Sequence, residues 1–227
     1  MKLFWFGHAC FLLDTGSHRL LFDPWLNTNP LSPVQASEIE CDYIFCSHAH
    51  DDHIADALEI AQRNKAVLIA PFELAEYFAS QGAETLDPMP GGALTLPFGR
   101  VYVTPAIHSS SLDLGGGKSV SMGNPVGFVV AAKDRKIYHA GDTGLFSDMQ
   151  WIGRHGLDVA MIPIGGHYTM GIDDAVDALD FLVTRLAVPM HFNTSEKIAA
   201  DPRVFETQAS ARGHTVRILA PGDCLDF

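Results

Sequence analysis

The segment that most constrains this chain is residues 48–53, which read His-Ala-His-Asp-Asp-His and follow the apolar run 43–46 after one serine. Histidine is the commonest metal ligand near neutral pH, and carboxylates complete sites for divalent ions. In an extended chain alternate side chains share a face, so His48 and His50 can point at one ion. A helix that starts near Asp52 would turn Asp52 and His53 toward a neighbouring point. The segment can therefore serve two adjacent ions, whereas a solvated polar turn is the alternative interpretation.

Three further candidates follow apolar segments later in the chain. His108 comes after the run 101–107, Asp142 after 137–141 and His191 after 188–190. In layered α/β proteins, binding and catalytic sites are built from the loops at strand ends. Each of the three alone would be read more simply as a structural or surface residue. Their recurrence after the histidine-rich segment indicates one shared metal site.

The hydrophobic pattern predicts short strands that alternate with helices. The expected strands are 3–6, 10–13, 20–22, 43–46, 67–70, 94–96, 101–104, 126–131, 137–139, 159–162, 188–190 and 216–219. The expected helices follow the metal motif from Ile54, lie around 74–78 and 204–211, and include one whose buried stripe is Val176, Leu179, Val183 and Leu186. Residues 24–40 contain three prolines and predict an irregular loop. The alternation of strands and helices favours an α/β architecture.

The composition restricts the classes of function. The chain has 227 residues, of which 47% are hydrophobic, so it can bury the core of one domain or of two fused half-units. The net charge of −12 and the absence of a Lys/Arg cluster argue against nucleic-acid binding, which depends on basic contacts. No apolar run approaches the roughly 20 residues that cross a bilayer. We therefore expect a cytoplasmic protein with no nucleic-acid or membrane partner.

The four cysteines show no Cys-x-x-Cys spacing. A disulfide framework or a thiolate zinc site is therefore not indicated, and buried free thiols in a reducing compartment are the expectation.

The order His-x-His-x-Asp-His, a lone His, an Asp in Gly-Asp-Thr-Gly and a late His resembles the metallo-β-lactamase superfamily. Within it, the chain resembles the small UPF0173 and ascorbate-6-phosphate-lactonase-like metal-dependent hydrolases. The segments that carry the closer match are 7–9, 23–24, 47–53, 108–111, 124–128, 141–144, 165–171 and 190–194. The resemblance implies a four-layer αββα sandwich, classed as α/β or in some schemes α+β. Residues 1–227 would form a single domain made of two similar ββα half-units.

The resemblance also implies a role for each candidate ligand. One metal would be bound by His48, His50 and His108, and the second by Asp52, His53 and His191, with Asp142 bridging both. A hydroxide held between the ions would be the nucleophile, because metal binding lowers the pKa of water to about 7. Asp52 would also act in catalysis by orienting or deprotonating that hydroxide. The expected cofactors are two divalent ions, in the first place zinc, with manganese or iron as alternatives.

Two further histidines are candidates for substrate contact. His8 lies in a turn between two apolar segments, where it could bind substrate or serve as a hydrogen-bonded turn residue. His167 lies in the glycine-rich segment 165–171, where backbone can approach a ligand closely. We hypothesise that His167 binds substrate or protonates the leaving group; a loop histidine without a role is the alternative. Residues 109–125 are expected as a loop that shapes the pocket or as a lid.

These inferences predict a metal-dependent hydrolase that attacks an ester, lactone or phosphoester of a small molecule. An iron-dependent redox enzyme on the same fold is the main alternative. An RNA or DNA phosphodiesterase is disfavoured by the acidic charge, and a non-catalytic metal protein is disfavoured by the complete ligand set. The expected partner is a small-molecule substrate, and relatives of this kind often form homo-oligomers.

Overall fold

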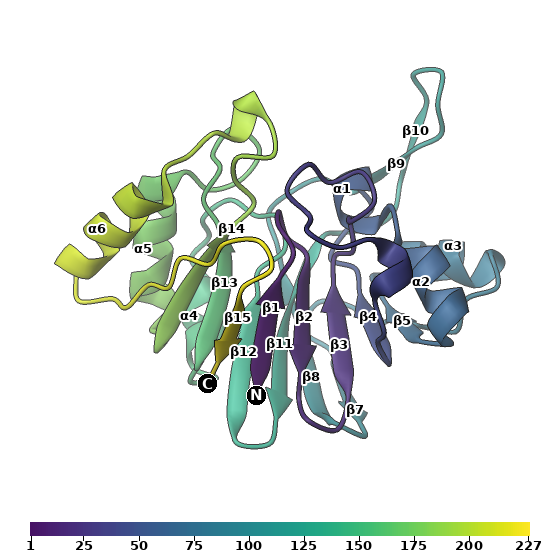
Figure 1. Ribbon diagram of the computed structural model, residues 1–227, viewed down its shortest axis with the longest axis horizontal. Coiled ribbons are helices and arrows are strands. Elements are labelled where there is room, and N and C mark those ends of the chain that lie inside the picture. The colour runs from purple at the N-terminus through teal and green to yellow at the C-terminus, as the bar shows by residue number, and fades with distance from the viewer.

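Two mixed β-sheets lie face to face at the centre of the computed structural model, which describes residues 1–227, and helices cover their outer faces (Figure 1). The first sheet has the strand order β15-β1-β2-β3-β4-β5-β6. Its strands are β1 (Lys2–Trp5), β2 (Phe11–Asp14), β3 (Arg19–Phe22), β4 (Tyr43–Phe45), β5 (Val67–Ile69), β6 (Thr85–Leu86) and β15 (Cys224–Asp226). The second sheet has the order β14-β13-β12-β11-β8-β7. Its strands are β7 (Ala93–Leu96), β8 (Gly99–Pro105), β11 (Val126–Ala132), β12 (Arg135–His139), β13 (Val159–Pro163) and β14 (Leu186–Met190).

The helices fall into two sets, one on each outer face (Figure 1). The set beside the first sheet is the 3-10 turn η1 (Ala36–Glu38), α1 (Asp51–Ile54), α2 (Ala57–Asn64) and α3 (Phe72–Ser80). The set beside the second sheet is α4 (Met149–Gly153), α5 (Ile172–Leu182), the 3-10 turn η2 (Glu196–Ile198) and α6 (Pro202–Ala211). The predicted α/β class and the four-layer order of helix, sheet, sheet and helix are therefore confirmed.

The central strands β2 to β5 of the first sheet are largely buried on both faces, which explains why they read as apolar runs and not as alternating patterns. Phe22 and Phe45 face the second sheet, where their rings stack with centroids 4.8 Å apart. Phe45 also meets Phe128 of β11 edge to face at 5.2 Å. Leu12 and Leu21 point the opposite way and pack in the cluster that holds α2 and α3. The sheets are thus fixed by one core between them and by helices outside.

This arrangement brings the ends of several strands to one edge of the sandwich. Strands β3 to β6 run parallel to one another, as do β12 to β14. His48 follows β4, His108 follows β8, Asp142 follows β12 and His191 follows β14, as the sequence predicts. Parallel strands end at the same edge of a sheet, so these loops meet.

The predicted helix with the stripe Val176–Leu186 is wrong at its end. Helix α5 stops at Leu182, and Val183 takes a left-handed conformation with φ 48°. Val183 is 70% exposed and does not pack in the core. Leu186 belongs to β14, because pairing of that strand with β13 outweighs the continued helical spacing.

The predicted last strand at 216–219 is also wrong. Val216 makes one isolated bridge with Ala187, and no strand forms there. The last strand is β15, which pairs with β1. Cys224 lies in β15 and is exposed, contrary to the expectation of buried thiols, whereas Cys10, Cys41 and Cys46 are buried and free.

The segment expected as a loop at 109–125 contains a hairpin of β9 (Ser111–Asp113) and β10 (Ser119–Ser121), which forms a separate two-stranded sheet. The hairpin projects from the body at the upper right of Figure 1. None of the helices is both long and apolar enough to cross a membrane.

Candidate metal centre

The candidate centre is organised around Asp142, which lies directly after Gly141. Gly141 has φ 61°, and a Cβ on it would lie 2.6 Å from the carbonyl oxygen of Val126, so only glycine fits this turn. The Asp142 carboxylate is buried. Four imidazole nitrogens approach its Oδ2 atom: Nε2 of His191 at 2.9 Å, of His53 at 3.4 Å, of His108 at 3.5 Å and of His48 at 4.0 Å. Residues from three separate loops therefore converge on one carboxylate, which a fourth loop carries.

The first donor group consists of His48, His50 and His108. The Nδ1 atom of His50 lies 2.9 Å from Nε2 of His48 and 3.3 Å from Nε2 of His108. One ligand atom from each of the three lies within 4.8 Å of the others. His48 is fully buried, and the other two are partly exposed. Three neutral imidazoles at this spacing form a ligand set that suits a divalent transition metal.

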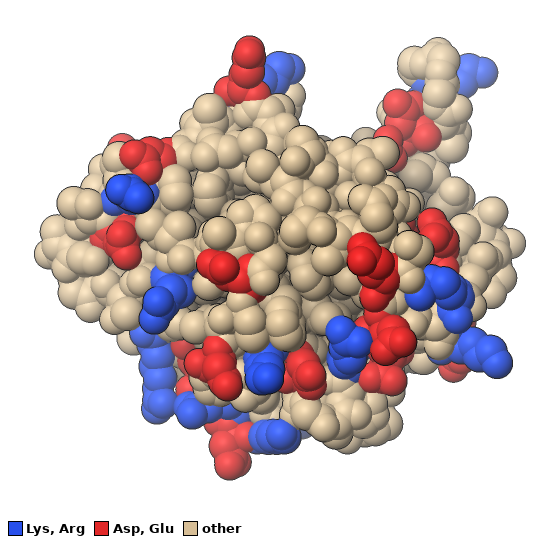
Figure 2. Space-filling model, in the orientation of Figure 1, with Lys and Arg blue, Asp and Glu red and all other residues tan.

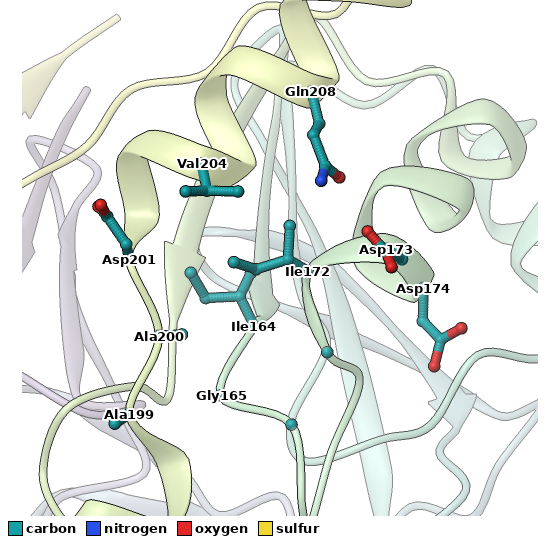
Figure 3. A pocket seen from close by; sticks show the side chains of 12 residues that line it. Ile164, Gly165, Ile172, Asp173, Asp174, Ala199, Ala200, Asp201, Val204 and Gln208 are labelled. Carbon is teal, nitrogen blue, oxygen red and sulfur yellow. The ribbon is translucent and has the colours of Figure 1, made fainter.

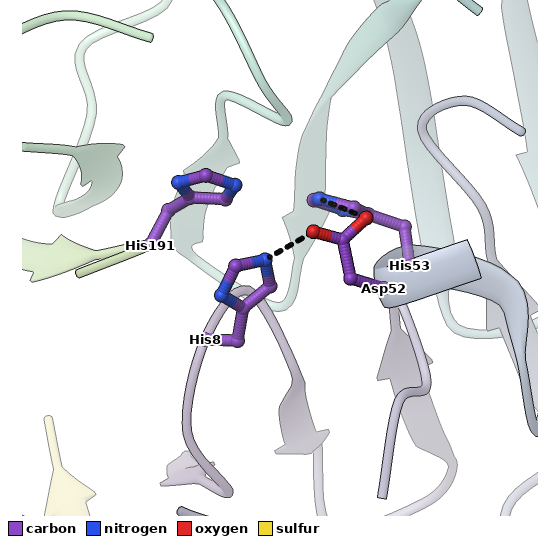
Figure 4. A group of neighbouring side chains, drawn as sticks. All are labelled: His8, Asp52, His53 and His191. Atoms are coloured by element: carbon purple, nitrogen blue, oxygen red, sulfur yellow. Dashed lines mark hydrogen bonds and ion pairs between the residues drawn. The ribbon is translucent and has the colours of Figure 1, made fainter. Parts of the chain in front are cut away.

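The second donor group consists of His8, Asp52, His53 and His191, whose ligand atoms also lie within 4.8 Å of one another (Figure 4). Asp52 and His53 come from the short helix α1, and His191 comes from the end of β14. The Nε2 atom of His8 lies 3.2 Å from Oδ2 of Asp52. The structure thus places His8 beside the three residues that the resemblance assigned to the second ion.

Two buried residues, Asp23 and Ser47, fix the orientation of two of these histidines. Asp23 Oδ2 lies 2.8 Å from Nδ1 of His53 and accepts the Ser47 hydroxyl at 2.7 Å. Since the hydroxyl proton of Ser47 is used on Asp23, the Nδ1–H of His48 donates to Ser47 Oγ at 2.9 Å. Both rings therefore turn Nε2 toward Asp142, and a carboxylate behind a ligating imidazole also raises its basicity.

His8 is held in the same manner by Thr194. The Thr194 hydroxyl lies 2.8 Å from Nδ1 of His8, and the backbone carbonyl of His8 accepts the N–H of His191 at 3.0 Å. His8 and His191 both have φ 54°, a conformation that non-glycine residues seldom adopt and that functional sites often contain. Because Asp52 can only accept, Nε2 of His8 carries a proton and the Thr194 hydroxyl donates to Nδ1. In this arrangement His8 orients the Asp52 carboxylate.

Burial and neighbouring charges shift the pKa values of these groups in opposite directions. Burial, aided by His191, lowers the pKa of His8 to about 4, and burial aided by His53 lowers that of His48 well below its usual range. Burial alone would also lower the pKa of His53, but the carboxylates of Asp142 and Asp23 raise it well above its usual value. His8 and His48 are therefore neutral near pH 7, and His53 is protonated.

Buried atoms without partners test whether the residues fit metal ions. Nε2 of His53 and Oδ1 of Asp142 are buried and make no hydrogen bond. Buried polar atoms in native proteins nearly always have a partner, and an ion is one such partner. Since these two atoms lie within the donor groups, the residues fit a metal centre.

The cavity over these groups has a volume of about 420 Å³ and is lined by His50, Asp52, His108, Ser109, Asp142, Tyr168 and His191. Neither His8 nor His167 lines it. His167 is exposed, and its ring meets the Tyr168 ring edge to face at 4.4 Å. Substrate contact by these two histidines stays a prediction. Tyr168 belongs to the segment 165–171 that carries the resemblance, but it was not predicted as a site residue; an aromatic side chain within a glycine-rich loop was the available signal.

A second cavity, of about 590 Å³, lies between the loop before α5 and the start of α6 (Figure 3). Gly165, Gly166 and Gly171 line this cavity, whereas Tyr168 of the same loop lines the first. It contains carboxylates but no histidine, so it lacks the donor set of the metal centre.

Comparison with known proteins identifies the family. The family model of the beta-lactamase superfamily domain matches residues 18–192. A UPF0173 metal-dependent hydrolase of Opitutus terrae is 57% identical over the full length of both chains, and one of Archaeoglobus fulgidus is 43% identical over 100% of this chain and 99% of its own. The solved structure of Igni18, a metallo hydrolase from Ignicoccus hospitalis, has a TM-score of 0.90 at 36% identity and covers 100% of this chain and 98% of its own.

The chain therefore belongs to the UPF0173 metal-dependent hydrolases of the beta-lactamase superfamily. This confirms the resemblance stated from the sequence, and it confirms the metallo-β-lactamase fold.

Proposed function

We propose that this UPF0173 metal-dependent hydrolase holds two divalent ions and cleaves an ester, lactone or phosphoester of a small molecule. The observation that carries the proposal is the pair of donor groups that share the Asp142 carboxylate. His48, His50 and His108 would hold one ion; Asp52, His53 and His191 would hold the other. Imidazole-rich sites suit zinc, and iron is the next candidate on the same grounds.

Ions bound there would lower the pKa of water to about 7 and polarise the scissile group. Asp52 lines the cavity and is the carboxylate available to accept a proton from the attacking water. His8 donates to Asp52 Oδ2 and so fixes the orientation of that carboxylate, whose Oδ1 lies 4.0 Å from Nε2 of His53. The pKa of Asp52 is depressed by this hydrogen bond and by His53, although burial opposes the shift, so Asp52 is ionised near neutral pH.

His167 is proposed to protonate the leaving group. It is exposed, and its ring lies edge to face against Tyr168, which lines the cavity. A His167→Ala variant should retain its metal and lose kcat/KM. Full metal content with unchanged kcat/KM would remove His167 from the mechanism.

Metal content and turnover, measured together, test the proposal. Untagged protein is analysed for metals and assayed against lactones, carboxylic esters and phosphoesters with added zinc or manganese. We expect about two ions per chain and turnover that a chelator abolishes. A single ion after reconstitution, or iron with oxygen uptake and no hydrolysis, would contradict the proposal.

A further inference from the structure

The cavity offers few groups that can choose a substrate. Of the seven residues that line it, five belong to the two donor groups and their shared carboxylate. The remaining two are Ser109 and Tyr168. The Ser109 hydroxyl lies 3.4 Å from Nε2 of His50, at the limit of a hydrogen bond. Substrate selection therefore depends largely on Tyr168 and on the groups that it contacts.

Tyr168 contacts a lysine from another loop. The Nζ atom of Lys197, in η2, donates a hydrogen bond of 3.1 Å to the Tyr168 hydroxyl and lies 5.7 Å from the centre of its ring. Lys197 has no acceptor, so the phenol oxygen receives this bond and the phenol proton stays free for a third group. The pair thus presents a positive charge and a hydroxyl donor beside the cavity.

The charge of Lys197 has no carboxylate partner. Arg212 of the same helical layer lies between Asp177 and Asp180. Arg154 and Arg203 also lack a carboxylate partner, but neither contacts a residue that lines the cavity over the donor groups. The only hydrogen bond of the Lys197 ammonium is to a neutral phenol. Figure 2 shows Lys and Arg mainly in the lower half of the visible face, whereas the ligand loops lie at the top in Figure 1. In a chain of net charge −12, an unpaired cation at this edge is available to an anion.

We propose that Lys197, together with the Tyr168 hydroxyl, selects substrates that carry an anionic oxygen, of a carboxylate or a phosphate, near the scissile bond. This rests on the proposed hydrolytic function and deepens it by naming the substrate class. Lys197 is a specificity-determining residue: the ammonium attracts the anion, and the phenol proton donates to it. Hydrogen bonds between charged groups are shorter and stronger than neutral ones, so Lys197 and Tyr168 should bind an anionic substrate more tightly than a neutral one.

Matched esters test the proposal on the metal-loaded enzyme. Mono-4-nitrophenyl glutarate carries a free carboxylate, and 4-nitrophenyl valerate is its neutral counterpart. The wild type should prefer the anionic ester in kcat/KM. In Lys197→Met the preference should fall about tenfold, chiefly through KM, because one hydrogen bond to a charged group is lost. Lys197→Arg should restore most of the preference, since it restores the cation.

Tyr168→Phe and a surface control complete the set. Tyr168→Phe removes the hydroxyl and should also lower the preference, and its effect should not add to that of Lys197→Met, because the two groups act as a pair. Lys118→Met, on the exposed β9–β10 hairpin, removes the same charge and should keep the wild-type preference. An equal loss in Lys118→Met would show a non-specific charge effect and overturn the proposal.

A binding measurement separates this inference from the hydrolytic function. Inorganic phosphate and glutarate are each titrated calorimetrically into the metal-loaded wild type, Lys197→Met and Lys197→Arg. Weaker binding of either anion to Lys197→Met alone supports anion binding by Lys197 and Tyr168, even if the wild type hydrolyses no ester. The anion that binds the wild type more tightly indicates whether the site prefers a phosphate or a carboxylate. Equal Kd values for both anions in all three proteins, or an unchanged ester preference in Lys197→Met, would overturn the proposal.

Discussion

The two donor groups differ in how firmly the protein holds them. In the second group, His8, His53 and His191 are at most 2% exposed, and His53 and His8 are braced by Asp23 and Thr194. In the first group only His48 is braced in this way. His50 and His108 are partly exposed, and their close polar contacts are with histidines, Asp142 and Ser109.

Asp142 therefore lies between two donor groups of unequal rigidity. A donor that is already oriented loses little side-chain entropy when an ion binds. We therefore expect the second group to bind its ion more tightly, and the ion of the first group to exchange more readily.

The largest effect is expected from Asp142→Asn, which removes the negative charge that both groups share. Occupancy of both ions should fall, and turnover should drop by a factor on the order of 10³ or more. Elemental analysis and activity measure the two effects, and circular dichroism checks the fold. If the variant kept two ions per chain, the Asp142 carboxylate would not be a ligand that the two donor groups share.

Asp23→Asn should weaken the bracing behind His53 and Ser47. Loss of such a partner typically lowers metal affinity by about 10- to 100-fold. Competition with a chromogenic chelator would measure both ions, and the tighter one should weaken most. If the weaker ion alone were lost, the assignment of the rigid site to the second group would be wrong.

The pH dependence should also differ between the groups. His53 has a raised pKa and is protonated near pH 7 without metal, so an ion must displace its proton. Affinity of the second group should then rise about tenfold per pH unit until the pH exceeds the pKa of His53. Burial lowers the pKa values of His48, His50 and His108, so these are already neutral and the first group should show a flat profile there.

Calorimetry in buffers of different ionisation enthalpy measures this proton release. About one proton should be released for the tighter ion at pH 7, and close to none for the weaker ion. Equal proton release for both ions would show that the protonation of His53 does not distinguish the two groups.

The smallest effect is expected from Thr194→Val, which removes the hydroxyl that donates to His8. A neutral hydrogen bond contributes about 1 kcal/mol, so kcat should fall roughly fivefold through a less well oriented Asp52. Thr207→Val, where the hydroxyl bonds a carbonyl on the surface of α6, is the matched control. A similar loss in both variants would exclude a specific role for the brace.

The sequence predicted the candidate ligands because their signal is local. Six residues contain four of them, and the rest follow strand ends that hydrophobic runs make visible. The support of Asp23 for His53 could not be predicted in this way. The two are 30 residues apart, and they meet because β3 pairs in parallel with β4, with Asp23 N–H bonded to the Phe45 carbonyl at 2.8 Å.

Loop side chains were harder to predict than strand ends, because their direction depends on single backbone angles. His167 has φ 52° and does not line the cavity, whereas its neighbour Tyr168 does. Similarly, the apolar residues 216–219 suggest a strand, but only Val216 pairs with β14, in one isolated bridge to Ala187. Composition does not encode such choices.

The pairing of β1 with β15 has a consequence for folding during synthesis on the ribosome. The amino group of Met1 donates to the carbonyl of Phe227, 226 positions later, and Lys2 lies opposite Asp226. At about 5–20 residues per second, the outer edge of β1 waits roughly 10 to 45 s after its own synthesis for its partner. Until then that edge is an unpaired template for other strands.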